Sequence, residues 1–387
     1  MKRGLTGTYE STSIGGETVS AFIPNPLPPA PPIQLDGPLH PLLERALLAL
    51  GRLDSVSTLL PGTGLFLYSY VRKEAVLSSQ IEGTQSSLSD LLLFEMEQVP
   101  GVPIVDVQEV SNYVAAMESG VSQLRAGFPF SARLIRDIHE KLLSRGRGSD
   151  KDPGQFRRSQ NWIGGSRPGN AVFVPPPHTV VGQCVSDLEK FVHSENNKLP
   201  HVVQAGLLHV QFETIHPFLD GNGRIGRVLI TLLLCSSGIL REPLLYLSLY
   251  FKKHRAEYYE LLEVVRKNGD WEKWLAFFLE GVADTAEGAV QTARRLVHLF
   301  ESDRVRIQNS GRKSGSLLRV HEALKQRPLS TVSEAASRSG LSFPATGSSM
   351  ESLVEMGLVR ELTGKKRNRV FIYDEYLAAL SEGTEPI

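Results

Sequence analysis

The alternation of apolar and polar positions predicts a mainly helical chain. Apolar residues recur every three or four positions in HPLLERALLALGRLDSV (40–56), VQEVSNYVAAMESGVSQL (107–124), SARLIRDIHEKLLS (131–144) and HVVQAGLLHVQFETIH (201–216). This spacing places the apolar side chains along one side of an α-helix. We therefore expect a mainly α fold in which short β segments are confined to connections between helices.

Two segments lack this helical pattern. Residues 1–36 are rich in Gly, Ser, Thr and Pro, which predicts a flexible, extended Pro-rich arm. Residues 152–178, DPGQFRRSQNWIGGSRPGNAVFVPPPH, combine Gly, Pro and Asn with the short β-type runs QNWIG and AVFV. That composition predicts a loop or β-hairpin inserted among the helices.

The same pattern divides the chain into further segments. We expect an N-terminal helical region at 37–110, a helical core at 111–302, a polar linker at 303–316 and a separate module at 317–387. In the last segment the predicted order is helix, helix, helix, hairpin, which is typical of a small winged helix. Basic residues surround the predicted wing, which could contact DNA phosphates: Arg360, Lys365, Lys366, Arg367 and Arg369. The helix before the wing is poor in basic residues, so a protein-docking or dimerising role remains open.

Composition points to an ordinary intracellular globular protein. Lys plus Arg and Asp plus Glu both number 42, so net charge indicates neither a nucleic-acid nor a membrane partner. Cys184 and Cys235 are too few and too far apart for a disulfide framework or a zinc cluster, which favours a reducing compartment. The first residues lack the apolar run of a secretory signal, and the apolar run at 228–235 is too short to span a bilayer. We expect a cytoplasmic protein with no membrane partner.

The segment HPFLDGNGRIGR (216–227) joins two apolar helical stretches. Pro217 is a natural stop for the first helix, and the apolar run from Val228 begins the body of the next. The glycine-rich part is therefore a loop that leads into a helix N-terminus, where free backbone N–H groups and the helix dipole attract anions. It is not a P-loop, because it lacks GK[ST] and follows a helix rather than a strand.

The side chains of this segment suit a nucleotide phosphate. Arg224 and Arg227 are three residues apart, on one side of the first helical turn, and can clamp phosphate oxygens. Asp220 can hold Mg²⁺, which takes one or two carboxylates and keeps phosphate oxygens as further ligands. His216 ordinarily titrates near neutral pH and suits a general base. A plain interhelical turn would not need all of these groups within twelve residues.

The segment matches the Fic-domain signature HPFx[D/N]GNGRxGR at every fixed position, and residues from about 35 to 285 resemble Fic proteins more widely. The wider resemblance includes the flap-like GQFRRSQNWIGG and AVFVPPPH and the later YLSLYFKKHRAEYYELL. It implies a protein adenylyltransferase that uses ATP and Mg²⁺ to place AMP on a Ser, Thr or Tyr hydroxyl of a target protein, or of itself. A kinase-like branch of the family carries Lys at the position of Gly223, so Gly223 favours AMP transfer.

The resemblance also implies a role for each residue of the motif. His216 would deprotonate the target hydroxyl, Phe218 would anchor the loop, and Asp220 would hold Mg²⁺. Arg224 would hold the β-phosphate and Arg227 the γ-phosphate. The residues expected to bind ATP are Gly221, Asn222, Gly223, Arg224, Gly226 and Arg227. A hairpin flap would align the target by main-chain pairing through Ile163, Gly164, Gly165, Val172, Phe173 and Val174.

A second motif is SSQIEG (78–83). From the residues alone it is a helix end with Gly83 as the cap, where Glu82 has an unfavourable position relative to the helix dipole but needs no special explanation. It resembles the [S/T]xxxE[G/N] motif of Fic inhibitory helices, carried here by Ser78, Glu82 and Gly83. Glu82 would then pair with Arg227 and deny this arginine to the γ-phosphate. AMP removal, transfer of another nucleotide-linked group and a DNA-binding regulator with a Fic core remain alternatives, and family habit suggests a homodimer.

Overall fold

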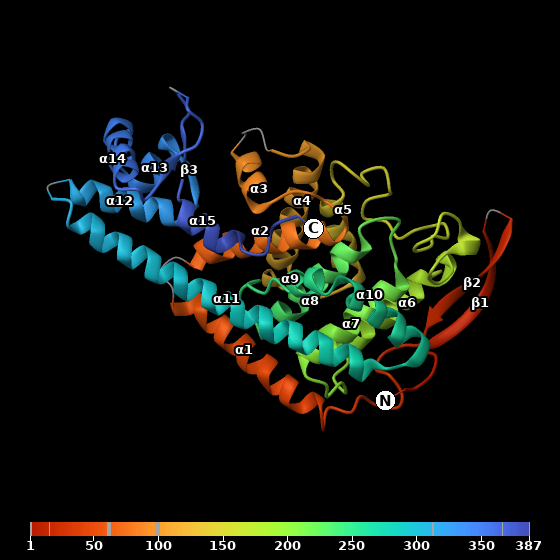
Figure 1. Cartoon of the computed structure of the whole chain (residues 1–387). Coiled ribbons are helices and arrows are strands. Elements are labelled where there is room, and N and C mark those ends of the chain that lie inside the picture. The colour runs from red at the N-terminus through yellow and green to blue at the C-terminus, as the bar shows by residue number, and fades with distance from the viewer. Residues whose placement is uncertain are drawn as a thin grey trace.

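The computed structural model describes residues 2–386 except 15, 60–62, 97–100, 312 and 366, and is shown in Figure 1. Helices dominate it, which confirms the predicted fold class. The N-terminal region contributes α1 (Leu39–Leu59), α2 (Thr63–Ile81) and α3 (Leu88–Glu95). The central helices are α4 (Ile104–Arg125), α5 (Ala132–Leu142), α6 (His178–His193), α7 (His201–Ile215), α8 (Asn222–Ser236), α9 (Ser248–Lys253), α10 (Arg255–Asn268) and α11 (Trp271–Gln308).

The centre of the core is α7, which is buried on every side from Val202 to Ile215. Its apolar residues do not form a single stripe, as expected for a helix that is surrounded by protein. It packs against α8, α6, α10 and α11, and Trp274 of α11 donates its indole N–H to the carbonyl of Gly206 at 2.9 Å. This packing fixes the end of α7, where the histidine of the central motif lies.

The prediction of a flexible, extended arm is wrong for residues 7–24. Strands β1 (Gly7–Ile14) and β2 (Glu17–Pro24) form an antiparallel hairpin with Gly7 opposite Pro24. Val19 and Ala21 of β2 pack against Val174, and the N–H of Phe22 donates to the carbonyl of Val174 at 2.9 Å. The partner that orders this segment lies about 150 residues away, so local composition could not reveal it.

The prediction of a polar linker at 303–316 is also largely wrong. Helix α11 continues to Gln308 and α12 begins at Ser314, so most of this segment is helical. Phe300, Asp303 and Ile307 follow helical spacing and are all buried, and Asp303 accepts a hydrogen bond from the hydroxyl of Tyr373. In Figure 1 α11 runs alongside α1 and continues toward the C-terminal helices.

The C-terminal segment contains the predicted three helices and hairpin. These are α12 (Ser314–Lys325), α13 (Val332–Ser339), α14 (Phe343–Glu355), β4 (Arg360–Glu361) and β5 (Val370–Ile372). Two elements were not predicted: β3 (Leu329–Thr331), which makes the strand order β3-β5-β4, and α15 (Asp374–Ser381). Lys366 of the predicted wing lies outside the described residues, and the winged-helix assignment stays a prediction.

Both cysteines are free thiols: Cys184 is buried in α6, and Cys235 lies near the end of α8. Within the part of the chain that the structure describes, no helix has the length and apolar character needed to cross a bilayer.

Candidate active site

The central motif forms a rigid turn between α7 and α8. The first helix ends at His216, whose backbone is left-handed (φ 48°, ψ 60°), and Gly221 precedes α8 with φ 78°. The side chain of Asn222 accepts from the N–H of Phe218 and donates to its carbonyl, both at 2.9 Å. The Asn222 side chain therefore holds the loop, so any contact of this residue with ATP would be through its backbone N–H.

Phe218 anchors the loop in the core, with its ring fully buried. It stacks on the ring of His139 from α5 at a centroid distance of 3.6 Å. The N–H of Gly154 donates to Nδ1 of His139, so the other ring nitrogen carries the proton and donates to the carbonyl of Asp220 at 3.0 Å. Burial lowers the pKa of His139 to about 4, which keeps it neutral. Sequence reasoning missed this residue, although a histidine on the buried face of an amphipathic helix was a signal.

Arg157 ties the loop to the flap segment and was also missed. Its guanidinium is buried and donates to the carbonyls of His216 at 3.0 Å and Pro176 at 2.5 Å. Its own backbone N–H donates to the carbonyl of Pro217 at 2.9 Å. Nothing in the spacing of the segment GQFRRSQNW distinguishes this arginine from its neighbour Arg158.

His216 has the properties of a base that is ready to accept a proton. Burial lowers the pKa of His216 to about 4, and the nearby positive charge of Arg157 acts in the same direction. Its Nδ1 makes no hydrogen bond with the described residues and lies 4.0 Å from Oε2 of Glu213. Burial also raises the pKa of Glu213 to about 7. At neutral pH the imidazole of His216 is therefore uncharged, as general-base catalysis requires.

The first turn of α8 offers an anion site beside this base. The backbone N–H groups of Asn222, Gly223 and Arg224 have no acceptor among the described residues, as is usual for a helix N-terminus. Oδ1 of Asp220 accepts from the N–H of Gly221 at 2.6 Å and from Arg224 at 3.3 Å. A negatively charged group of a ligand would find three parallel donors here.

The carboxylate of Asp220 fits the expected Mg²⁺ ligand. The side chain is about one third exposed, and its Oδ2 makes no hydrogen bond within the described chain. No group of three or more metal-ligating side chains occurs in the described ranges, so phosphate oxygens and water would have to complete the shell. That arrangement is normal for Mg²⁺, which is often bound by one or two carboxylates and the substrate's phosphates.

Arg224 is already paired with a carboxylate that sequence reasoning did not identify. Its Nη1 lies 2.6 Å from Oε1 of Glu109 on α4, and both side chains are almost completely buried. Arg147 approaches the same oxygen at 3.3 Å. Burial raises the pKa of Glu109, against the opposing attraction of Arg224. Glu109 therefore helps to hold the guanidinium in place before any phosphate arrives.

We expect Glu109→Gln to lower the free energy of unfolding by about 3 kcal/mol, because it leaves the buried charge of Arg224 with only partial compensation. Denaturant titration of the purified protein measures this difference. Glu301→Gln is the matched control, since Glu301 pairs with Arg304 at the surface and should contribute about 0–1 kcal/mol. Equal stabilities of the two variants would contradict the prediction.

The SSQIEG motif reaches Arg227, the second arginine of the loop. The Nη2 of this buried arginine lies 2.7 Å from Oε1 of Glu82, and its Nε donates to Oγ of Ser78 at 2.7 Å. Gly83 has a φ of 101°, so the chain leaves the helical path directly after Glu82. Burial disfavours the charged form of Glu82, but the attraction of Arg227 outweighs it and lowers the carboxyl pKa. Arg227 is thus held by side chains of the same chain.

Two glycines of α8 make these approaches possible. A Cβ on Gly223 would come within 2.3 Å of Oε1 of Glu82, so a larger residue here would push the carboxylate out of its present position. A Cβ on Gly226 would come within 2.5 Å of Oε1 of Glu213. Gly226 therefore serves helix packing beside the site, and any contact with ATP would be through its backbone.

The flap segment is simpler than the predicted hairpin. Ile163 and Phe173 form one β-bridge, exchanging N–H···O bonds of 2.8 and 3.1 Å, and the short 3-10 helix η1 (Pro168–Asn170) lies between them. Gly164 and Gly165 have positive φ angles and turn the chain there, while Val172 is exposed. Longer pairing is absent within these described residues because the turn and η1 occupy the segment. The carbonyl of Val174 is already bonded to β2.

Two family profiles match the parts of the chain that carry this site. The Fic/DOC family N-terminal profile matches residues 40–122, and the Fic/DOC family profile matches residues 129–234. The protein adenylyltransferase Fic of Culex quinquefasciatus is 29% identical over 222 residues, which cover 56% of this chain and 41% of that relative. The Aedes aegypti protein of the same name is 30% identical with the same coverage. The chain thus spans about two fifths of the length of the curated relatives it matches.

Solved structures share the fold. A Fic family protein from Desulfovibrio desulfuricans superposes with a TM-score of 0.56 at 19% identity, covering 88% of this chain and 98% of the other. A Fic domain containing signaling protein from Bacteroides thetaiotaomicron gives a TM-score of 0.53 at 18% identity, covering 65% and 97%.

Proposed function

Because the chain belongs to the Fic/DOC family, we propose that it is a protein adenylyltransferase that moves AMP from ATP to a Ser, Thr or Tyr hydroxyl of a target protein. One observation carries this proposal: a neutral His216 ends α7 beside the first turn of α8, where free N–H groups, Arg224 and Arg227 meet. A base beside an anion site is what attack on a nucleotide phosphate requires.

In the proposed reaction the imidazole of His216 accepts the proton of the target hydroxyl. The hydroxyl oxygen attacks the α-phosphorus of ATP, the bond between this phosphorus and the oxygen bridging to the β-phosphate breaks, and pyrophosphate leaves. The N–H groups of α8 and the charge of Arg224 stabilise the negative charge on the phosphate oxygens. Asp220 would hold Mg²⁺, which screens phosphate charge when bound. The proton on His216 then passes to solvent.

We further propose that Glu82 inhibits this reaction. The γ-phosphate would need the guanidinium of Arg227, which is bonded to Glu82 and Ser78. A carboxylate at this place also repels the negative charge of the triphosphate.

Docking of the target would use the flap. One side of the segment 172–174 is bonded to β2 through Phe22, whereas Trp162 and Val172 are exposed. An extended target segment could add to the side of residues 161–164 by main-chain hydrogen bonds.

The rate of AMP transfer should not follow the ordinary titration of histidine. Since the pKa of His216 is lowered to about 4, its ring is neutral at neutral and mildly acidic pH and is lost as a base only when the pH falls through that pKa. A pH–rate profile of the uninhibited Glu82→Gly variant should thus be flat across the range in which free histidine titrates, near 6.5. Because burial also raises the pKa of the neighbouring Glu213 to about 7, a half-maximal rate near pH 6.5 that persists with Glu213→Gln would contradict the proposed environment of His216.

One experiment tests the proposed function. The purified protein and its Glu82→Gly variant are incubated with a target extract and ATP labelled at the α- or the γ-phosphate. Label on protein from the α-position only is the expected result, and label from the γ-position only would indicate a kinase. Loss of label from a preloaded AMP-protein would identify AMP removal.

DNA binding by the C-terminal module has weaker support. Two of the arginines around the predicted wing are paired within the module, Arg360 with Asp374 at 2.8 Å and Arg369 with Glu351 at 3.1 Å. Paired arginines are less available to DNA phosphates. DNA retention without label in the experiment above would favour the regulator hypothesis. A homodimer and a cytoplasmic location stay predictions.

A further inference from the structure

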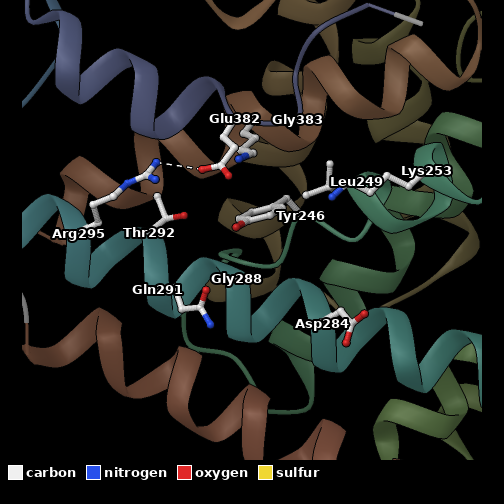
Figure 2. A pocket seen from close by; sticks show the side chains of 11 residues that line it. Tyr246, Leu249, Lys253, Asp284, Gly288, Gln291, Thr292, Arg295, Glu382 and Gly383 are labelled. Atoms are coloured by element: carbon white, nitrogen blue, oxygen red, sulfur yellow. Dashed lines mark hydrogen bonds and ion pairs between the residues drawn. The ribbon is translucent and has the colours of Figure 1, made fainter.

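A cavity of about 370 Å³ lies away from the candidate active site, between α2, α9, α11 and the segment that follows α15. Figure 2 shows Asp284, Gln291, Thr292 and Arg295 extending from α11 on one side, with Glu382 and Gly383 opposite them and Tyr246 between. Lys73 of α2 and Lys253 at the end of α9 complete the charged part of the lining.

Lys73 is the unusual member of this lining. The residue is only 2% exposed, yet its ammonium makes no hydrogen bond or ion pair with the described residues. Its Nζ lies over the ring of Tyr246, 4.7 Å from the ring centroid. A cation–π contact satisfies none of the ammonium's N–H donors, so these donors are left to water or to a ligand in the cavity. Burial lowers the pKa of Lys73 to about 8, so at neutral pH it still carries its charge.

The other charges of the cavity leave a positive excess. Arg295 pairs with Glu382 at 3.0 Å, and Asp284 pairs at 2.7 Å with Arg45, which Glu287 approaches at the same distance. Lys253, like Lys73, has no ion-pair partner in the described ranges. Lys73 and Lys253 therefore line the same cavity without a direct ion pair, and Glu382 and Glu385 attract Lys73 only from beyond ion-pair distance.

We propose that this cavity binds a small organic anion, whose phosphate or carboxylate group is held by Lys73 and Lys253. Its volume falls at the lower end of small-molecule sites, roughly 300–1,000 Å³. A bare ion would leave most of it unfilled, since one water occupies about 30 Å³. The polar groups of Gln291 and Thr292 on α11 would face the rest of the ligand.

The cavity and the SSQIEG motif share helix α2. Lys73 lies on α2, one and a half turns before Ser78. The same helix is held by the C-terminal segment, because the side chain of Gln80 donates to the carbonyl of Thr384 at 2.8 Å and accepts from Lys252 at 2.7 Å. A ligand that binds this arrangement stabilises it, and so would reinforce inhibition by Glu82. This last step rests on the proposed function, whereas the binding site does not.

Pyridoxal 5′-phosphate is a suitable probe for the site, because it carries an aldehyde and a phosphate. Its aldehyde forms an imine with a lysine amine and releases water, and borohydride then supplies the hydride that makes the adduct permanent. The full-length protein is treated in buffer near the pKa of Lys73, reduced, and mapped by peptide mass spectrometry. Lys198, which is exposed, serves as the internal control.

We expect pyridoxal 5′-phosphate to label Lys73 about tenfold more than Lys198. Pyridoxal, which lacks the phosphate, should lose this preference, and citrate or pyrophosphate should protect Lys73 but not Lys198. Lys73→Met should abolish saturable binding of pyridoxal 5′-phosphate in equilibrium dialysis, whereas Lys198→Met should not. Equal labelling by the two aldehydes, or labelling of Lys73 that neither anion reduces, would overturn the proposal in favour of a cavity that holds only water.

The connection to activity has a separate test. Citrate should lower the residual AMP transfer of the wild-type protein by about fivefold or more, and should have no such effect on the Lys73→Met variant. If citrate leaves the rate unchanged although Lys73 is labelled as expected, the link between the cavity and inhibition is refuted, but the binding site is still supported. If neither the wild type nor Glu82→Gly transfers AMP, the proposed function fails, and the labelling experiment still decides the site.

Discussion

Replacement of His216 with alanine is expected to lower AMP transfer by about 10²- to 10⁴-fold, the range that a positioned general base contributes. The imidazole lies at the end of α7, beside the first turn of α8. Its lowered pKa keeps it uncharged, so the loss of the ring removes a base that is fully available at neutral pH.

The measurement uses the Glu82→Gly background, in which the starting rate is high, and labelled ATP. Asn222, Asp220 and both arginines stay in place, so the double variant should still bind ATP with an affinity near that of Glu82→Gly. His193→Ala is the matched control, because His193 lies at the end of α6 and bonds the carbonyl of Phe130. An active His216→Ala double variant would rule out the proposed role.

The second large effect is expected from Glu82→Gly, which should raise AMP transfer by roughly 10- to 150-fold. This range corresponds to about 1.5–3 kcal/mol, the usual contribution of a hydrogen bond to a charged group. Removal of the carboxylate frees Nη2 of Arg227 from its 2.7 Å contact and takes a negative charge away from the expected γ-phosphate position. Ser78 remains to hold the guanidinium through Nε.

Initial rates with ATP labelled at the α-phosphate check this prediction. Glu195→Gly is the control, because Glu195 is exposed in the turn after α6 and far along the chain from Arg227. Glu82→Gln separates charge from size: it should give an intermediate rate, since the amide still fills the space beside Gly223. The autoinhibition proposal fails if Glu82→Gly binds ATP but is no faster than the wild type.

The part of the site that the residues alone revealed is contiguous in the chain, whereas Ser78 and Glu82 were reached only through the family resemblance. His216, Asp220 and Arg227 lie within twelve residues, so a loop and one helical turn are enough to bring them together. The residues that sequence reasoning missed come from other elements. Glu109, His139 and Arg157 approach the loop only because α4, α5 and the flap segment pack around it. No spacing rule links them to the motif, since tertiary packing alone brings them near.

The fold shows the same division between local and distant causes. Helices with a clear apolar stripe, such as α5, were predicted from their own residues. The hairpin β1–β2 was not, because the partner that orders it is Val174. The segment DRVRIQ at the end of α11 was predicted as a linker because it is polar. One side of it is buried, because Asp303 accepts a hydrogen bond from Tyr373 of the C-terminal module. Local pattern describes an element well when the element's own residues determine its burial.

The unbroken course of α11 changes how the two ends of the protein can influence each other. A helix of 38 residues is roughly 57 Å long and can bend sharply only where its hydrogen bonds are interrupted. Such a helix transmits movement along its length. A tilt of about 5° at Trp274 would displace the C-terminal end of α11 by roughly 5 Å. Asp303 and Arg306 bond the C-terminal module to this helix. If the C-terminal module moves, α11 must therefore tilt against α1, or the hydrogen bonds of Asp303 and Arg306 must break.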